Sequence, residues 1–174
     1  MKLNLGCGTV PEPGFVNVDS MEMPGVDTAW DLDVFPWPWE DGSASRIKAW
    51  DVFEHVMKPY EFMRECWRVL KPGGVLDLQT VWCKSPNYHR DPGHWRGLDH
   101  QSLDYWIPGT FLHGKYGPAY TGGYAEFSLV QPVALDGAMN LRWLLKKPQR
   151  GIAGEQGPEL VAMRDGVPVT PATS

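Results

Sequence analysis

Two short runs at the start of the chain constrain the fold more than any other feature. Residues 2–6 (KLNLG) and 15–19 (FVNVD) alternate apolar and polar side chains, which is the pattern of a β-strand with two different faces. Only residues 7–14 lie between them, and two of these residues are prolines. A crossover helix between parallel strands needs about a dozen residues. The sequence therefore predicts two early strands whose connecting helix is nearly absent.

The later part of the chain alternates strand and helix patterns. Apolar residues recur at helical spacing over 59–71, and Pro72-Gly73-Gly74 is expected to end this helix. Two late runs flank Asp136-Gly137, which resembles a hairpin turn. The other expected elements are strands at 28–33, 46–50, 75–81, 124–134 and 139–146 and a short helix at 100–107. This order predicts an α/β fold with a mostly parallel sheet and an antiparallel C-terminal edge hairpin.

The length of the chain, 174 residues, suits one compact domain. We expect this domain over 1–148 and a Gly/Pro-rich tail over 149–174, with a small hairpin at Arg164-Asp165-Gly166. Charges or prolines break every apolar run well before about 18 residues, so no membrane span is expected. The N-terminus lacks the apolar region of a secretory signal.

The three cysteines indicate a reducing compartment. Cys7, Cys66 and Cys83 cannot all pair with one another, and their spacing does not form a metal-type CxxC. Disulfides are rare in reducing compartments. We therefore expect a cytoplasmic protein.

Charge is spread unevenly along the chain. Residues 1–57 hold 3 basic and 10 acidic side chains, within a net charge of −5 for the whole chain. A nucleic-acid backbone usually attracts the opposite sign, so this balance disfavours DNA or RNA as a partner. Two interpretations remain: ordinary surface acidity, or a site for a cationic small ligand in the front part.

A glycine-rich turn and three carboxylates are expected to meet at one edge of the sheet. Gly6-Cys7-Gly8 follows the first strand, and a glycine pair in this place is most often only a tight turn. Asp19, Asp33 and Asp51 each come at or just after the end of a predicted strand. Ligands of open parallel sheets bind outside the carboxyl ends of the strands, so these residues would line one crevice.

The kind of ligand follows from what this turn lacks. No helix N-terminus stands behind it to hold a pyrophosphate, and the chain contains no GK[ST]. A ligand with ribose and adenine but no phosphate fits better, with Asp19 accepting from the ribose hydroxyls and Asp33 from the adenine amino group. S-adenosylmethionine has these parts, and its positively charged sulfur suits the acidic front part of the chain.

Over about residues 3–81 the sequence resembles the class I S-adenosylmethionine-dependent methyltransferases. LNLGCG is similar to their first motif, and GFVNVDS to the strand that carries the ribose-binding acid. The family's stretch with the adenine-site acid, "lPFpdnsfD" and "vlEHl" is resembled by DLDVFPWPWEDGSASRIKAWDVFEHV. The family's "rvLkPGG" corner between helix and strand is resembled by ECWRVLKPGGVLDLQTV. Asn4 stands where the first motif usually has an acid. The resemblance implies a Rossmann-like methyltransferase sheet, S-adenosylmethionine as cofactor, and a cofactor site at Asn4, Gly6, Cys7, Gly8, Asp19, Asp33 and Asp51.

The loop over residues 88–100 holds three of the five histidines. The spacing of His89, His94 and His100 matches no standard zinc pattern, so no metal site is predicted. Asp91-Pro92-Gly93-His94 resembles a "DPtH" run found in one branch of the family. Two interpretations stay open: a loop over an acceptor pocket, or a structured surface loop whose polar groups satisfy one another.

On the first interpretation, His94 or Asp91 is the base or orienting group for the acceptor, and His55 is the next candidate. Glu54 is expected to be structural and to hydrogen-bond backbone groups. The sequence thus predicts methyl transfer from S-adenosylmethionine to a small-molecule acceptor. The alternative is a catalytically silent S-adenosylmethionine-binding module or a partner subunit of the same fold.

The near absence of a helix between the first two strands also affects whether the chain is expected to form a dimer. Parallel sheets bury both faces, so something must cover the apolar positions that this helix normally covers. We expect either a second copy of the chain, as a homodimer, or the tail after Pro148 to cover them.

Overall fold

The computed structural model describes residues 1–121, 125–149, 162–164 and 167–169. Its strands are β1 (Lys2–Leu5), β2 (Val16–Asp19), β3 (Thr28–Ala29), β4 (Ala44–Trp50), β5 (Leu70–Val81), β6 (Ser128–Leu129), β7 (Ala134–Leu135), β8 (Asn140–Lys146), β9 (Ala162–Arg164) and β10 (Val167–Val169). Its helices are α1 (Pro59–Val69), α2 (Pro86–Arg90), the 3-10 helix η1 (Asp104–Trp106) and α3 (Phe111–Thr121).

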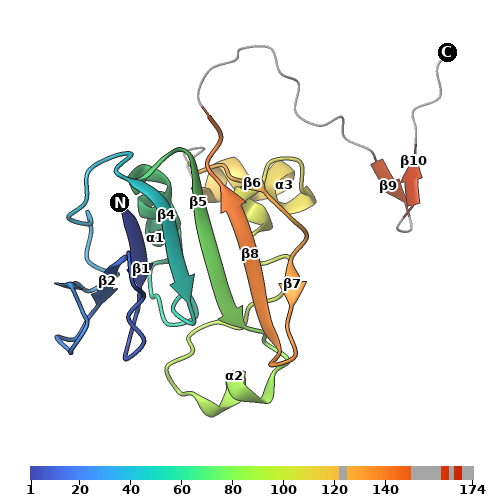
Figure 1. Cartoon of the computed structure of the whole chain (residues 1–174). Helices are drawn as coiled ribbons and strands as arrows, with labels where there is room; N and C mark the ends of the chain where they lie inside the picture. Colours follow the sequence, from blue (N-terminus) through green and yellow to red (C-terminus); the bar gives the residue numbers. More distant parts are fainter. Residues whose placement is uncertain (122–124, 150–161, 165–166, 170–174) are drawn as a thin grey trace.

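The main sheet has the strand order β3-β2-β1-β4-β5-β8-β6, and β7 also pairs with β8 (Figure 1). The strands β1 to β5 pair in parallel, whereas β6, β7 and β8 pair antiparallel. The turn predicted at Asp136-Gly137 joins β7 to β8, and Asp136 N donates to Asn140 O at 3.0 Å. The predicted α/β class, with a mostly parallel sheet and an antiparallel C-terminal edge, is confirmed.

The connection from β1 to β2 contains no helix, as predicted, and the two strands pair directly in parallel. The side chain of Asn17 in β2 holds this connection. Its Oδ1 accepts hydrogen bonds from Asn4 Nδ2 at 2.9 Å and from Glu12 N at 2.7 Å. Cys7 N extends the strand pairing by donating to Val18 O at 2.9 Å. Hydrogen bonds within the connection therefore fix the two strands without a helix.

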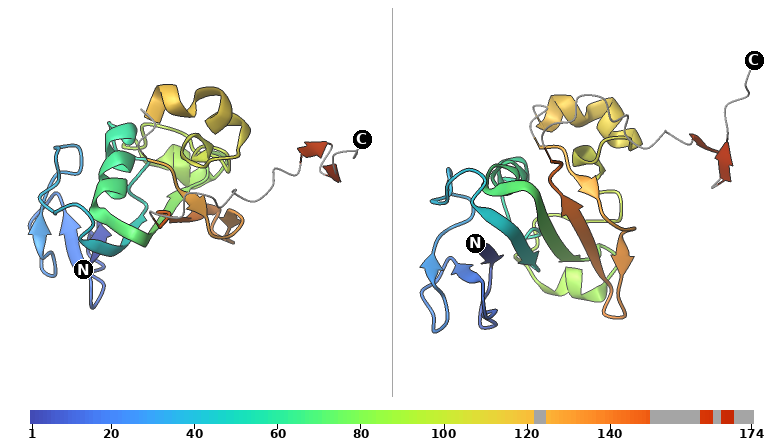
Figure 2. Two further views of the ribbon diagram at one scale, coloured as in Figure 1. Left: turned by 90° about the horizontal axis from the view of Figure 1, so that it is seen from above. Right: turned by 45° about the horizontal axis from the view of Figure 1, so that its top comes forward.

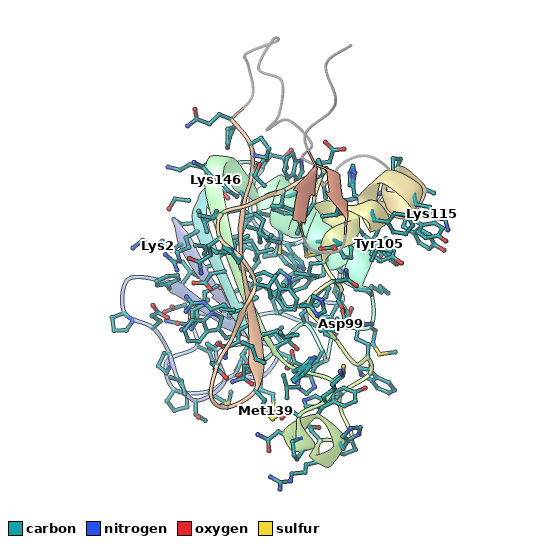
Figure 3. The ribbon with its side chains drawn as sticks, turned by 90° about the vertical axis from the view of Figure 1, so that its right-hand side faces the viewer. Lys2, Asp99, Tyr105, Lys115, Met139 and Lys146 are labelled. Atoms are coloured by element: carbon teal, nitrogen blue, oxygen red, sulfur yellow. The ribbon has the colours of Figure 1, made fainter. Side chains whose placement is uncertain are left out.

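The two faces of the sheet differ in what covers them. Helices α1 and α3 lie on the same side of the sheet in both views of Figure 2. In the side view of Figure 3, Lys2 and Lys146 of the sheet lie on one side, and Tyr105 and Lys115 of the helical region on the other. No helix of the described residues covers the side opposite α1 and α3.

The core lies between the sheet and α1. Helix α1 begins at Pro59, whose fixed φ suits a first helical position, and it turns one apolar face inward. Phe62 and Cys66 of α1 are fully buried in one cluster with Ile47 and Leu76 of the sheet. Burial of a large apolar side chain such as Phe62, Ile47 or Leu76 stabilises the fold by about 1.5–3 kcal/mol.

The uncovered face of the sheet carries charged side chains. Asp77 of β5 is only 1% exposed, and its carboxylate accepts from Arg142 Nε at 2.8 Å and from Trp50 Nε1 at 3.2 Å. Arg46 forms a third contact with it. Burial by itself would raise the pKa of Asp77, but the hydrogen bonds from Arg142, Arg46 and Trp50 lower it. The expectation of uncovered apolar positions is therefore wrong for this part of the face.

Strand β5 begins where α1 ends, so the helix predicted over 59–71 stops earlier, at Val69. Pro72-Gly73-Gly74 lies within β5, in a bulge between the residues that pair with Ala44 and Arg46 of β4. Gly73 has φ +77°, which glycine adopts without strain. The run therefore shapes a strand irregularity and does not end the helix.

Several other expectations need correction. Strand β3 is shorter than 28–33, and the helix at 100–107 is only the short η1. In place of one strand over 124–134, the structure has two separate two-residue strands, β6 and β7, and β7 ends at Leu135. Helix α2 lies in the expected loop, and α3 was not predicted. Pro118 and two glycines interrupt the apolar pattern of α3. One of them, Gly117, allows close packing, because a Cβ there would lie 2.8 Å from His113 Cδ2.

Near the C-terminus, β9 and β10 pair antiparallel on either side of the predicted hairpin turn. Residues 165–166 of that turn, and most of the tail predicted over 149–174, lie outside the described residues. Within the described part of the chain, no helix has the length and apolarity needed to cross a bilayer.

Candidate cofactor site

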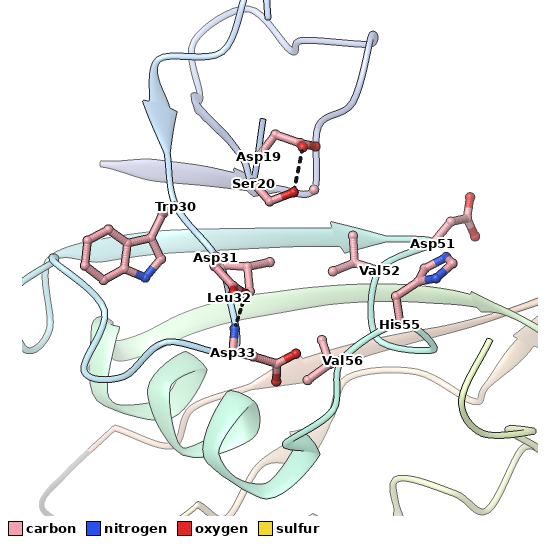
Figure 4. A pocket seen from close by; sticks show the side chains of 11 residues that line it. Asp19, Ser20, Trp30, Asp31, Leu32, Asp33, Asp51, Val52, His55 and Val56 are labelled. Atoms are coloured by element: carbon pink, nitrogen blue, oxygen red, sulfur yellow. Dashed lines mark hydrogen bonds between the residues drawn. The ribbon is translucent and has the colours of Figure 1, made fainter. Parts of the chain in front are cut away.

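A cleft of about 310 Å³ opens beside the carboxyl ends of the first strands. Its volume falls at the lower end of the range for small-molecule sites, roughly 300–1,000 Å³. In Figure 4, Trp30 lies at one end of the cleft, and Asp51 and His55 lie at the other. The lining residues are Gly6, Asp19, Ser20, Trp30, Asp31, Leu32, Asp33, Asp51, Val52, His55 and Val56.

The glycine turn after β1 contributes one residue, Gly6, to the lining of this cleft. Gly6 has φ +62°, and a Cβ at this position would lie 2.1 Å from Val52 Cγ2. Only glycine fits such a close approach in this conformation. Two residues further, Gly8 N donates to Asp19 Oδ2 at 2.9 Å. The turn is thus fixed both to the segment after β4 and to the end of β2.

Asp19 presents its carboxylate at the end of β2. Besides the bond from Gly8, its Oδ1 accepts from Met21 N at 3.2 Å and from the Ser20 hydroxyl at 3.5 Å. A carboxylate has about four acceptor positions, so these contacts orient Asp19 and leave capacity for a ligand. Three of these positions are occupied, and the contact from the Ser20 hydroxyl is the longest of the three, so a second ligand donor would have to replace it.

Asp33 has a structural role as well as a place in the cleft. Its two carboxylate oxygens accept from Met57 N and Lys58 N, both at 2.9 Å, just before α1 begins. Its own amide donates to Asp31 Oδ1 at 2.9 Å. Asp33 therefore joins the loop after β3 to the start of α1, and it brings Asp31 into the cleft wall.

Asp51 follows β4 in an unusual backbone conformation, with φ +54°. Its amide donates to Gln79 O at 2.9 Å, and its carboxylate accepts from Gln79 Nε2 at 3.5 Å. Partial loss of hydration raises the pKa of the Asp51 carboxyl, against the effect of the Gln79 hydrogen bond. With Asp19, Asp31 and Asp33, it makes four carboxylates in a cleft whose lining includes no Lys or Arg.

Glu54 precedes the lining residue His55 in the chain, is 1% exposed, and accepts a hydrogen bond from Val81 N at its Oε1, at 3.2 Å. This confirms the expected structural role. Burial raises the pKa of the Glu54 carboxyl, although backbone hydrogen bonds act in the opposite direction. The backbone carbonyl of Glu54 accepts from Trp95 N at 3.0 Å, and Arg96 donates to Phe53 O at 3.1 Å. These bonds attach the loop after α2 to the segment that follows β4.

This attachment brings His55, Asp91 and His94 together at the edge of the cleft. The ring centroids of His55 and His94 are 4.8 Å apart, and His94 Nε2 lies 3.8 Å from Asp91 Oδ2. His89 and His100 are exposed and lie outside this cluster.

The structure brings part of the predicted site into one cleft. Gly6, Asp19, Asp33, Asp51 and His55 line it, while Asp91 and His94 reach it through His55. The remaining predicted residues, Asn4, Cys7 and Gly8, do not line it.

The residues that stay out of the cleft have other contacts. Asn4 is buried and bonded to Asn17, Cys7 is 6% exposed, and Gly8 acts through Asp19. Sequence reasoning did not identify six lining residues, which follow strand ends in the chain: Ser20, Trp30, Asp31, Leu32, Val52 and Val56.

Comparison with solved structures identifies the fold. An S-adenosylmethionine-dependent methyltransferase from Thermotoga maritima, titled a possible histamine N-methyltransferase, is 16% identical with a TM-score of 0.57, over 84% of this chain and 81% of that one. A methyltransferase from Archaeoglobus fulgidus is 14% identical with a TM-score of 0.57, over 84% and 85%. The 1,6-didemethyltoxoflavin-N1-methyltransferase of Burkholderia thailandensis, with S-adenosylhomocysteine bound, is 13% identical with a TM-score of 0.55, over 85% and 71%.

At these identities the likeness establishes the fold: the chain has the fold of class I S-adenosylmethionine-dependent methyltransferases. The family described as "Methyltransferase domain" matches residues 27–78. No curated protein matches the sequence. The family match and the fold confirm the resemblance predicted from the sequence, and they support S-adenosylmethionine as the cofactor.

Proposed function

We propose that this protein transfers a methyl group from S-adenosylmethionine to a small-molecule acceptor. The observation that carries the proposal is the charge of the cleft, where four carboxylates converge and the lining includes no Lys or Arg. Such a site attracts a cation and repels phosphate groups. When bound, S-adenosylmethionine supplies an activated methyl group on a positively charged sulfur, and loss of that group leaves S-adenosylhomocysteine.

The residues of the cleft suggest how the cofactor would lie. Asp19, which the glycine turn orients, would accept from the two ribose hydroxyls, one of which would replace the Ser20 hydroxyl. Asp33 would accept from the adenine amino group at the Trp30 end. The sulfur would then lie toward Asp51 and His55 at the opposite end.

The acceptor would bind where His55, Asp91 and His94 meet. These side chains would orient the attacking atom in line with the methyl group, and positioning of this kind can supply roughly 7–11 kcal/mol. The three thiols of the chain are free, which fits the cytoplasmic location that we also propose.

Two measurements on the full chain test this function. Calorimetry with S-adenosylhomocysteine is expected to show binding at one site, and release of S-adenosylhomocysteine from S-adenosylmethionine should depend on an added acceptor. His94→Ala should lower this release by about 100-fold, while binding of S-adenosylhomocysteine is retained. His89→Ala, which removes an exposed imidazole of the same loop, is the control. Binding without release across a broad acceptor panel would favour the silent binding module instead.

A further inference from the structure

We propose that His55, Asp91 and His94 bind a divalent transition-metal ion of the Zn²⁺ type at the edge of the cleft. One ring nitrogen of each histidine and one carboxylate oxygen of Asp91 lie within 4.8 Å of one another. Two imidazoles and one carboxylate form a common ligand set for catalytic Zn²⁺, which keeps a further position open. The spacing of histidines along the chain could not reveal this set, because His55 comes from a distant segment.

The hydrogen bonds of the two histidines fix which nitrogen would bind the ion. His55 Nδ1 lies 3.0 Å from Gly93 O, and His94 Nδ1 lies 2.9 Å from Tyr88 O. A carbonyl oxygen only accepts, so each Nδ1 carries the proton and each Nε2 has a free lone pair in the neutral ring. Metal-bound histidines commonly donate their second N–H to a backbone carbonyl in this way.

Asp91 is oriented by the same turn. Gly93 N donates to Asp91 Oδ1 at 2.7 Å, which leaves Oδ2 on the side of His94 Nε2. A Cβ on Gly93 would lie 3.1 Å from Asp91 Oδ1 and 3.2 Å from His55 Nδ1. The backbone of Gly93 thus holds both Asp91 and His55, through its N–H and its carbonyl oxygen.

The separations are close to those of a bound ion. Ligand atoms around tetrahedral Zn²⁺ lie about 3.4 Å apart, since each is roughly 2.0–2.1 Å from the metal. Asp91 Oδ2 and His94 Nε2 are already 3.8 Å apart. An ion pair would explain the contact between Asp91 and His94, but it would not explain why His55 lies beside them as a third possible ligand. The side chains of His55 and Asp91 are exposed, so an ion would have to draw the three groups together from separations of at most 4.8 Å.

This site also indicates the class of acceptor, a step that rests on the proposed function. His55 belongs both to the proposed metal site and to the cleft lining, so an ion held there would lie beside the end of the cleft proposed for the sulfur. The ion would bind the methyl acceptor through an oxygen or nitrogen atom of the acceptor, such as the oxygen of a hydroxyl or carboxylate group. The enzyme should then favour methyl acceptors that carry such a metal-binding atom near the atom to be methylated.

The experiment titrates the metal-free full chain with ZnCl₂ by calorimetry and records the visible spectrum with CoCl₂. Wild type and His89→Ala should each bind one Zn²⁺, and bound Co²⁺ should give the absorption of a nitrogen- and oxygen-liganded ion. His94→Ala and, separately, Asp91→Asn should weaken Zn²⁺ binding by about 10- to 100-fold or more and change the Co²⁺ spectrum. Asp91→Asn preserves the size of the side chain, so it remains informative if His94→Ala folds poorly.

Absence of Zn²⁺ binding to the wild type would overturn the proposal, as would equal affinity in His89→Ala, Asp91→Asn and His94→Ala. Calorimetry with S-adenosylhomocysteine on the same samples separates the two proposals. Cofactor binding without Zn²⁺ binding refutes the metal site alone. Zn²⁺ binding without cofactor binding supports the metal site and refutes the proposed function.

Discussion

Asp19 is the residue on which the proposed cofactor site depends most. Asp19→Ala should weaken binding of S-adenosylhomocysteine by about 2–4 kcal/mol, because hydrogen bonds to a charged acceptor are the stronger kind. Calorimetry measures the change. Glu22→Ala, which removes an exposed acid nearby that does not line the cleft, should leave the affinity unchanged. Equal affinity in both variants would show that the ribose does not bind at Asp19.

Asp77 is the residue whose expected effect is on the stability of the fold. Its folded-state pKa lies below the ordinary value, so its contribution is complete above the unfolded pKa of about 3.9 and is lost as the pH falls through the folded pKa. Asp77→Asn should lower the free energy of unfolding by about 2–3 kcal/mol at pH 7, and by less near pH 3, where the carboxyl of the unfolded chain is mostly protonated. Urea unfolding at both pH values measures this.

Asp41→Asn is the matched control for Asp77, because Asp41 also pairs with an arginine, Arg68, but its side chain is 81% exposed. Its effect should stay within about 1 kcal/mol at both pH values. A cost for Asp77→Asn that does not change with pH would contradict the ionised state assigned to that residue.

At the scale of elements, the turn after β1 connects the fold to the site. Gly6→Ala would place a methyl group 2.1 Å from Val52 Cγ2 at φ +62°, whereas Gly8→Ala at φ +50° meets no atom within 4 Å. Both changes strain the backbone, by about 1–3 kcal/mol. Only Gly6→Ala should also displace Val52 and weaken binding of S-adenosylhomocysteine. Thermal unfolding measures the stability of the two variants, and calorimetry measures their affinity for S-adenosylhomocysteine. Equal affinity in both variants would contradict the role assigned to Gly6.

Elements with a regular pattern could be predicted from the sequence. The first strands alternate in polarity, and the apolar positions of α1 repeat at helical spacing, so local sequence and tertiary packing agree. Helix α3 could not be predicted, because Pro118 and two glycines weaken its local preference and its contact with α1 is long-range information.

The candidate site was predictable to a similar degree. Asp19, Asp33 and Asp51 could be found because each comes at or after a strand end, where parallel sheets bind ligands. The contact between His55 and His94 depends on how the loop after α2 attaches to the segment after β4, through bonds such as that from Arg96 to Phe53. Nothing local in the sequence encodes that attachment.

For the whole molecule, the uncovered face of the sheet bears on assembly. The homodimer stays a prediction, but charged groups such as Arg46, Asp77 and Arg142 replace the apolar surface that motivated it. Either a second copy of the chain or the tail after Pro148 was expected to cover this face. Light scattering on the full chain and on a chain ending at Gln149 tests both possibilities. A dimer in both chains would support the second copy, and loss of solubility only in the shorter chain would support the tail. A folded monomer from the shorter chain would contradict both.

The most direct test of the central claim is a crystal structure of the full chain with S-adenosylhomocysteine. We predict that the ribose hydroxyls bind Asp19, that the adenine lies toward Trp30 and Asp33, and that the sulfur faces the end of the cleft that holds Asp51 and His55. Binding of S-adenosylhomocysteine elsewhere on the protein, or in the cleft in the reverse direction, would contradict this arrangement. An empty cleft at saturating ligand would contradict the cofactor site itself.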